Sequence, residues 1–81
     1  MRWKDTNIRR KEKRMLSNLI GQMKERKISQ LELARTLGIS NVSVAHKLRG
    51  ITDFTLTEIF KIRDTYFPER TIEWLFKKME V

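Results

Sequence analysis

Residues 29–50 have the sequence SQLELARTLGISNVSVAHKLRG, in which two short helical patterns follow one another. Ser29 and Ser40 each come directly after an isoleucine, and the residue four positions beyond each serine, Leu33 or Val44, is again apolar. A hydroxyl residue flanked in this way is typical of a helix N-terminus with a hydrophobic staple, where the serine oxygen accepts a backbone N–H bond. The stretch therefore predicts two successive helix starts.

Each of these two patterns is followed by a glycine, Gly38 or Gly50. A residue with positive φ commonly ends a helix, and glycine adopts that conformation without the steric cost of a Cβ. Helices are therefore expected at about 30–37 and 41–49. Helices of two turns are marginal alone, so they need the rest of the chain as a packing surface. Two short helices joined by an abrupt turn are typical of a DNA-reading unit.

The segments on either side also have helical spacing. Four apolar residues at i, i+3, i+4 and i+7 predict a first helix from about Ile8 or Arg10 to Arg26. These residues are Leu16, Leu19, Ile20 and Met23. Gly21 lies inside this helix and lowers its stability by about 1 kcal/mol relative to Ala. A close crossing by another helix would explain it.

Downstream, Thr55 follows Phe54 in the same arrangement and predicts a helix at about 56–65. Glutamates three positions after Ser29 and Thr55 predict a capping box at each of these two starts. Pro68 breaks the chain after that helix, and a last helix is expected at about 71–79. Its apolar face would consist of Ile72, Leu75, Phe76 and Met79.

Length and composition favour one small all-α domain. The 81 residues are 40% hydrophobic and contain no cysteine, which excludes disulfides, thiolate chemistry and cysteine-ligated zinc. No apolar run is long enough to span a membrane, and the basic start is not followed by the apolar stretch of a signal peptide. We therefore expect a cytoplasmic protein.

The charge points to a polyanionic partner. Lys and Arg outnumber Asp and Glu by 18 to 10, for a formal net charge of +8. Residues 1–14 contain seven basic and two acidic residues, so much of the excess lies at the start of the chain. Nucleic acid and an anionic membrane surface both attract such a domain. The basic segment has no sustained apolar face, which disfavours the membrane.

Catalysis has little support in the sequence. The chain has a single histidine, and no pair of carboxylates stands apart from caps and basic neighbours. No glycine-rich phosphate loop is present, and the lone histidine has no partner ligand for a metal. We therefore expect no enzymatic activity, cofactor, metal site or small-molecule substrate.

The central stretch resembles the helix-turn-helix of the phage repressor and Cro superfamily, also called the XRE-like family. The matching positions are Gln30, Leu33, Ala34, Leu37, Gly38, Ile39, Ser40, Val44 and Gly50. The resemblance continues through residues 54–62 and weakens before residue 12 and after Tyr66. It implies a five-helix, repressor-like fold for residues 1–81 as one domain, with the helix-turn-helix at 29–50. It also implies binding to a double-stranded DNA operator, in a bacterium or a phage-infected host.

In this family the second helix of the motif enters the major groove. The residues that would then read bases are Asn41, Val42, Ser43, His46 and Lys47. Asparagine can pair with adenine, and valine can contact a thymine methyl group. The alternative is that Asn41 only begins a helix. Many family members have an apolar residue where this chain has Lys47, and that departure leaves the roles of Lys47 and Arg49 open.

Phosphate contacts are expected from both ends of the motif and from the N-terminus. The candidates are Gln30, Arg49, Arg9, Arg10 and Lys11. Residues 1–9 would form a basic arm on the phosphates or in the minor groove, or alternatively a solvated segment without a DNA contact. The predicted function is a sequence-specific transcriptional regulator, of the Cro-like or short phage repressor kind. The alternative is a protein-interaction module on the same fold, such as an antitoxin or a phage inhibitor.

One domain reads only a few base pairs, so specificity in a genome usually requires two half-sites. We therefore expect a homodimer on a pseudo-palindrome, with half-site centres about one helical turn, ~10–11 bp, apart. Apolar residues outside the expected face of the last helix would form the dimer interface. These are Trp74, Val81 and Phe67, with Tyr66 beside them.

Overall fold

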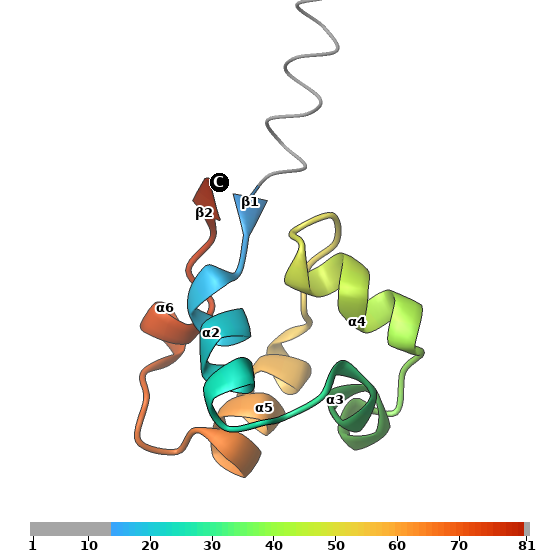
Figure 1. The fold of residues 1–81 in the computed structure, drawn as a ribbon, viewed down its shortest axis with the longest axis horizontal. Helices are drawn as coiled ribbons and strands as arrows, with labels where there is room; N and C mark the ends of the chain where they lie inside the picture. The colour runs from blue at the N-terminus through green and yellow to red at the C-terminus, as the bar shows by residue number, and fades with distance from the viewer. Residues whose placement is uncertain (1–13, 81) are drawn as a thin grey trace, which may run out of the picture.

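The computed structural model of the chain describes residues 14–80 and contains five helices and two very short strands (Figure 1). In chain order the elements are β1 (Arg14–Met15), α2 (Ser17–Glu25), α3 (Gln30–Leu37), α4 (Asn41–Leu48), α5 (Leu56–Tyr66), α6 (Ile72–Leu75) and β2 (Met79–Glu80). The predicted all-α, five-helix fold is confirmed. The antiparallel β1–β2 pair, with Arg14 opposite Glu80, was not predicted. The predicted sites at Arg9, Arg10, Lys11 and Val81 lie outside the described residues.

The predicted helix starts at Ser29, Ser40 and Thr55 are all N-caps. Each hydroxyl oxygen accepts a hydrogen bond from the backbone N–H three residues later, at 3.0–3.1 Å. At Thr55 the Glu58 carboxylate also accepts from the Thr55 N–H at 2.9 Å, which completes the predicted capping box. The box predicted at Ser29 is only half formed, because the structure has the bond to Ser29 without the returning carboxylate bond.

Three consecutive helices end in the same way, on a residue with positive φ. Gly38 and Gly50 have φ of 72° and 79°, as predicted, and Lys27 has φ of 58°. In each case the next residue donates its N–H to the carbonyl five residues earlier: Ile28 to Met23, Ile39 to Ala34 and Ile51 to His46. This arrangement satisfies carbonyls that the helix end leaves unpaired and turns the chain sharply. It determines how α3 and α4 meet.

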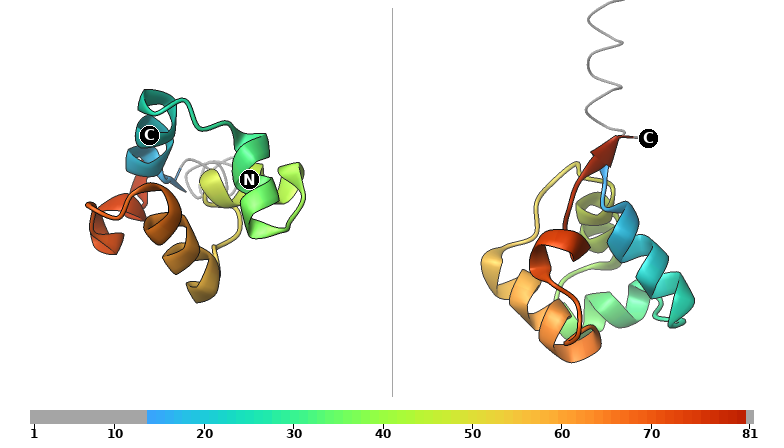
Figure 2. Two further views of the ribbon diagram at one scale, coloured as in Figure 1. Left: turned by 90° about the horizontal axis from the view of Figure 1, so that it is seen from below. Right: turned by 90° about the vertical axis from the view of Figure 1, so that its left-hand side faces the viewer.

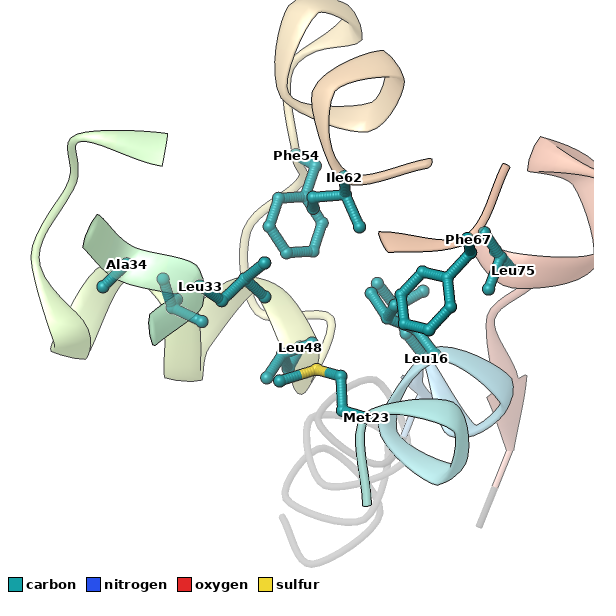
Figure 3. Packing of buried hydrophobic residues seen from close by; sticks show 11 residues of the cluster. Leu16, Met23, Leu33, Ala34, Leu48, Phe54, Ile62, Phe67 and Leu75 are labelled. Atoms are coloured by element: carbon teal, nitrogen blue, oxygen red, sulfur yellow. The ribbon is translucent and has the colours of Figure 1, made fainter. Parts of the chain in front are cut away.

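Every helix contributes to one hydrophobic core (Figure 3). Its fully or nearly fully buried members are Leu16, Leu19, Met23, Leu33, Ala34, Val44, Leu48, Phe54, Ile62, Phe67 and Leu75. Ala34 is 3% exposed where α3 packs against α4, and its small side chain allows the two helices to approach closely. The short helices α3 and α4 therefore owe their stability to burial rather than to their length.

The first helix begins later than predicted, at Ser17. Leu16 is not helical, because its N–H donates to the Leu48 carbonyl at the end of α4 at 3.0 Å. Arg14 and Met15 pair instead with β2. Within residues 14–80 no neighbouring side chain or backbone atom would lie within 4 Å of a Cβ at Gly21, so the suggested close helix crossing is not found there.

The last helix is much shorter than the predicted 71–79 and spans Ile72–Leu75. Phe76 leaves the helix and packs edge-on against Phe54, with ring centroids 5.7 Å apart. Lys78 then bonds to Asp53, and Met79 joins β2. Tertiary contacts therefore outweigh the helical spacing of these apolar residues.

The elements are arranged so that α4 and α6 lie at opposite ends of the molecule (Figures 1 and 2). In Figure 2 the α3–α4 pair forms one corner, α2 and α6 lie away from it, and α5 lies between them and packs against both α3 and α6. No helix within residues 14–80 is long and apolar enough to cross a membrane.

Candidate nucleic-acid interface

The helix α4 has one buried face and one exposed face. Val44 and Leu48 are 0% and 6% exposed and hold the helix to the core. On the opposite side Val42, His46 and Arg49 follow one another at i, i+4 and i+7, and all three are exposed, Val42 to 64%. A spacing of four and three residues places side chains on one helical face. Three of the predicted DNA-contacting residues therefore share a single open surface.

At the start of α4, Asn41 is bonded to the first residue of α3. Gln30 Nε2 donates to Asn41 Oδ1 at 3.0 Å and to the Asn41 carbonyl at 3.2 Å. An asparagine amide has one acceptor oxygen and one donor NH₂ group. The bond to Oδ1 therefore fixes the direction of the amide and leaves Nδ2 as a donor at the exposed end of the helix. Asn41 is the first residue of α4 and does not cap it, because the N-cap is Ser40.

Ser43 lies between the two faces and is half-buried. Its oxygen accepts from the Ser40 hydroxyl at 3.0 Å, while Ser40 accepts the Ser43 N–H. The Ser43 hydroxyl therefore keeps a proton to donate. Ser43 is placed next to Asn41 and Val42, at the N-terminal end of the exposed face.

Lys47 does not belong to that face, in contrast to the prediction that it reads bases. Its side chain is 15% exposed, and its Nζ donates to the Asp53 carbonyl at 2.8 Å and lies 3.3 Å from Glu58 Oε1. The ammonium group also lies 5.8 Å from the centre of the Phe54 ring. Many family members have an apolar residue at this position. Lys47 buries the aliphatic part of its side chain there, and its ammonium group links α4 to the start of α5.

The loop after α4 carries Arg49 and is held by backbone bonds. Ile51 and Thr52 both donate to the His46 carbonyl, at 2.9 and 3.5 Å. Arg49 is exposed directly before this turn. The guanidinium group therefore projects from a fixed backbone at the C-terminal end of the exposed face, where it suits a phosphate.

The electrostatics of this surface favour an anion. The helix α4 contains no carboxylate. The nearest acidic residues downstream are each paired with a lysine, Glu58 with Lys47 and Asp53 with Lys78. The hydrogen bond from Lys78 holds the pKa of Asp53 below its usual value of 3.8, so this carboxylate is charged and paired at neutral pH. Negative charge is thus neutralised beside the exposed face.

Among the predicted dimer residues within residues 14–80, Phe67 and Trp74 do not share an exposed surface. Phe67 is 0% exposed and belongs to the core of a single chain, so its assignment to an interface is wrong. Tyr66 is half-buried, and its hydroxyl bonds to Thr36 Oγ1 at 2.5 Å. Of the predicted dimer residues that the structure describes, only Trp74 is exposed, to 39%. The pattern at the end of the chain suggested one apolar patch, but the turn at Phe67 directs that ring inward.

Within residues 14–80 no group of three or more His, Asp or Glu side chains is arranged to hold a metal. Sequence reasoning missed two features of the site. These are the Gln30–Asn41 bond and the removal of Lys47 from the exposed face. The first pairs residues eleven positions apart across a turn, and no local spacing signals it.

Comparison with known families agrees with this geometry. A family model described as helix-turn-helix (HTH_3) matches residues 22–67, which run from α2 to the end of α5. No curated protein and no solved structure matches the chain. The matched residues contain the α3–α4 unit and its exposed face. The chain therefore belongs to the helix-turn-helix family of the XRE/Cro/C1 type, a family of DNA-binding domains that is typically non-enzymatic.

Proposed function

We propose that this protein is a sequence-specific transcriptional regulator of the Cro-like or short phage repressor kind, acting in the cytoplasm on an operator in double-stranded DNA. The observation that carries the proposal is the exposed face of α4, where Val42, His46 and Arg49 stand in one row beside Asn41. The row has a donor amide at one end and a guanidinium group at the other.

The chemistry of these side chains fits the edges of bases in the major groove. Asn41 and His46 offer hydrogen bonds, and Val42 offers an apolar surface for a thymine methyl group. Arg49 flanks the row and is suited to a phosphate, whereas the side-chain NH₂ of Gln30 is engaged with Asn41. The basic residues of the N-terminal segment, including Arg9, Arg10 and Lys11, add phosphate contacts outside the motif. Base contacts then supply specificity, and phosphate contacts supply much of the affinity.

The test is selection of bound sequences from a random duplex pool, followed by binding measurements at several salt concentrations. If five to eight phosphates are contacted, log K falls with log salt at a slope of about −5 to −7. The selected sequence should be a pseudo-palindrome with half-sites one helical turn of DNA, or a multiple, apart. A flat salt response, or no enrichment after selection, would exclude the proposal.

A second candidate function is a protein-interaction module on the same fold, such as an antitoxin or a phage inhibitor. Leu56 and Phe60 favour it, because they lie one turn apart on α5 and are 68% and 43% exposed. An inhibitor that does not bind DNA would fail the selection experiment. An antitoxin would bind DNA and would also lose its protein partner when Leu56 and Phe60 are replaced by serine.

A further inference from the structure

A pocket of about 250 Å³ lies beside the loop that joins α4 to α5. Its apolar lining consists of Leu16, Phe54, Ile59 and Phe76, which come from four separate segments of the chain. The rings of Phe54 and Phe76 pack edge-on against each other, with centroids 5.7 Å apart. Pockets for drug-sized ligands enclose about 300–1,000 Å³, so this one suits a single ring or a short branched chain.

The charged lining of the pocket is positive on balance. It consists of Lys47, Asp53 and Lys78, which are two cations and one anion. Each ammonium group has three N–H donors. Within residues 14–80 the partners of Lys47 Nζ are the Asp53 carbonyl and Glu58. The partner of Lys78 Nζ within the same residues is Asp53 Oδ1. The pocket therefore has more N–H donors than protein acceptors.

A carboxylate of the protein itself already occupies the position that a ligand carboxylate would take. The hydrogen bond from Lys78 holds the pKa of Asp53 below its usual value of 3.8, so a carboxyl group at this point is ionised at neutral pH. The side chains of Asp53 and Lys78 are 74% and 42% exposed. Exposed ion pairs contribute little to stability. A carboxylate that brings apolar atoms into the pocket can therefore displace Asp53 from Lys78.

We propose that this pocket binds a small carboxylic acid with an apolar body, whose carboxylate replaces Asp53 at Lys78 while its body packs on Phe54 and Phe76. A single negative charge balances the single positive charge that remains among the lining residues. An amine would meet two ammonium groups and be repelled. A neutral ring would bury apolar surface but would leave the ammonium N–H groups without an acceptor.

The pocket is connected to the DNA-binding surface by the loop after α4. Arg49 begins this loop, and Asp53 and Phe54 line the pocket near its end. When the ligand takes Lys78, the charge of Asp53 is no longer paired, and it lies four residues from the predicted phosphate contact. An unpaired carboxylate there repels DNA. The acid should therefore weaken DNA binding, and this regulatory part of the inference rests on the proposed function.

The first experiment is a titration of the full chain with benzoate, followed by the NMR signals of the backbone amides. Benzoate should shift the signals of residues 52–54 and 76–78 and saturate with a dissociation constant of about 1 mM or lower. Benzamide has the same ring without the charge, and benzylamine has the opposite charge. Both should bind about tenfold more weakly, because they lack the charge-assisted hydrogen bond. Equal binding of the three probes, or no saturation by benzoate, would overturn the proposal.

Substitutions at the charged rim test the exchange of carboxylates. Lys78→Met keeps the aliphatic stem and should weaken benzoate binding by about tenfold. Lys77→Met is the matched control, because it makes the same change in net charge at an exposed neighbour outside the lining, and it should bind benzoate as the wild type does. Asp53→Asn removes the competing carboxylate and should strengthen benzoate binding. Weaker binding by Asp53→Asn would mean that Asp53 does not compete, which contradicts the proposal.

The second experiment measures operator binding with and without saturating benzoate at constant ionic strength. The affinity of the wild type should fall by about fivefold or more, which is the usual lower range of coupling between two sites. Acetate has the charge without the ring and should have no such effect. In Asp53→Asn benzoate should change the affinity little, because no carboxylate is released. Saturable benzoate binding without a change in operator affinity would overturn the regulatory part. A protein that binds benzoate but no duplex DNA would contradict the proposed function and leave the pocket in place.

Discussion

Gln30, the first residue of α3, donates two hydrogen bonds to Asn41, the first residue of α4. The bonds cross the turn of the helix-turn-helix and orient the Asn41 amide with its NH₂ group available. A side chain whose direction is already set loses less conformational freedom when it binds a base. The pair thus links a predicted phosphate contact to a predicted base contact.

The first prediction concerns the coupling of these two residues. Gln30→Ala should weaken operator binding by about 1 kcal/mol, because Asn41 loses the bond that orients it. In a double-mutant cycle with Asn41→Ala, the two substitutions should be non-additive by roughly 0.5 kcal/mol or more. The measurement is fluorescence anisotropy with the selected operator. Additive effects would mean that Gln30 and Asn41 contact the DNA independently.

A second prediction separates base contacts from phosphate contacts on α4. His46→Ala should cost about 1–3 kcal/mol on the operator and little on random duplex DNA. Arg49→Ala should weaken both DNAs alike and make the salt slope shallower by about one unit. Both side chains are exposed, so neither change should alter the melting temperature. If His46→Ala reduces binding to both DNAs equally, α4 does not read sequence at this position.

Lys47 provides a third prediction, since its ammonium group is used inside the protein. Lys47→Met keeps the apolar stem and removes the bonds to Asp53 and Glu58. The free energy of unfolding, measured in urea, should fall by about 1–2 kcal/mol. The selected operator sequence should be the same as for the wild type. A changed base preference with unchanged stability would mean that Lys47 contacts bases and does not stabilise the fold.

The fourth prediction compares two glycines that both have space for a Cβ. Gly21 is inside α2, so Gly21→Ala should stabilise the single chain by about 0.5–1 kcal/mol. Gly38 has φ of 72°, so Gly38→Ala should destabilise it by about 1 kcal/mol because the backbone conformation is strained for alanine. Thermal unfolding at low protein concentration measures both. Equal effects would contradict the difference in backbone conformation.

The fifth prediction is a loss of stability in acid that depends on Glu69. Hydrogen bonds from Arg26, and then from its own backbone N–H, hold the pKa of Glu69 below its usual value of 4.5. Since the folded pKa is the lower one, this contribution is complete above about pH 4.5 and is lost as the pH falls through the folded pKa. Glu69→Gln should therefore lower the melting temperature at pH 7 and have less effect at pH 3. An equal effect at both values would show that the ion pair does not contribute.

Much of the helical fold was predictable because its signals are local. The hydroxyls of Ser29, Ser40 and Thr55 each bond to a backbone N–H three residues away, so residue type and spacing suffice to place a helix start. The positive φ at Gly38 and Gly50 is likewise a property of the residue type. Lys27 has the same positive φ after α2 although it is not a glycine. The end of α2 was therefore predicted only from the place where the helical spacing of apolar residues stops.

The sequence by itself determined that there are five helices and where the N-caps of α3, α4 and α5 lie, because each of these signals depends on interactions within about five residues. Tertiary structure alone decided where α2 begins and α6 ends. There, Leu16 bonds to Leu48 and Phe76 packs on Phe54, and these long-range contacts outweigh helical spacing. It also turned Lys47 away from the DNA-binding face and Phe67 into the core. A side chain next to a turn has two environments of similar local energy, and only the burial and pairing offered by distant segments select one.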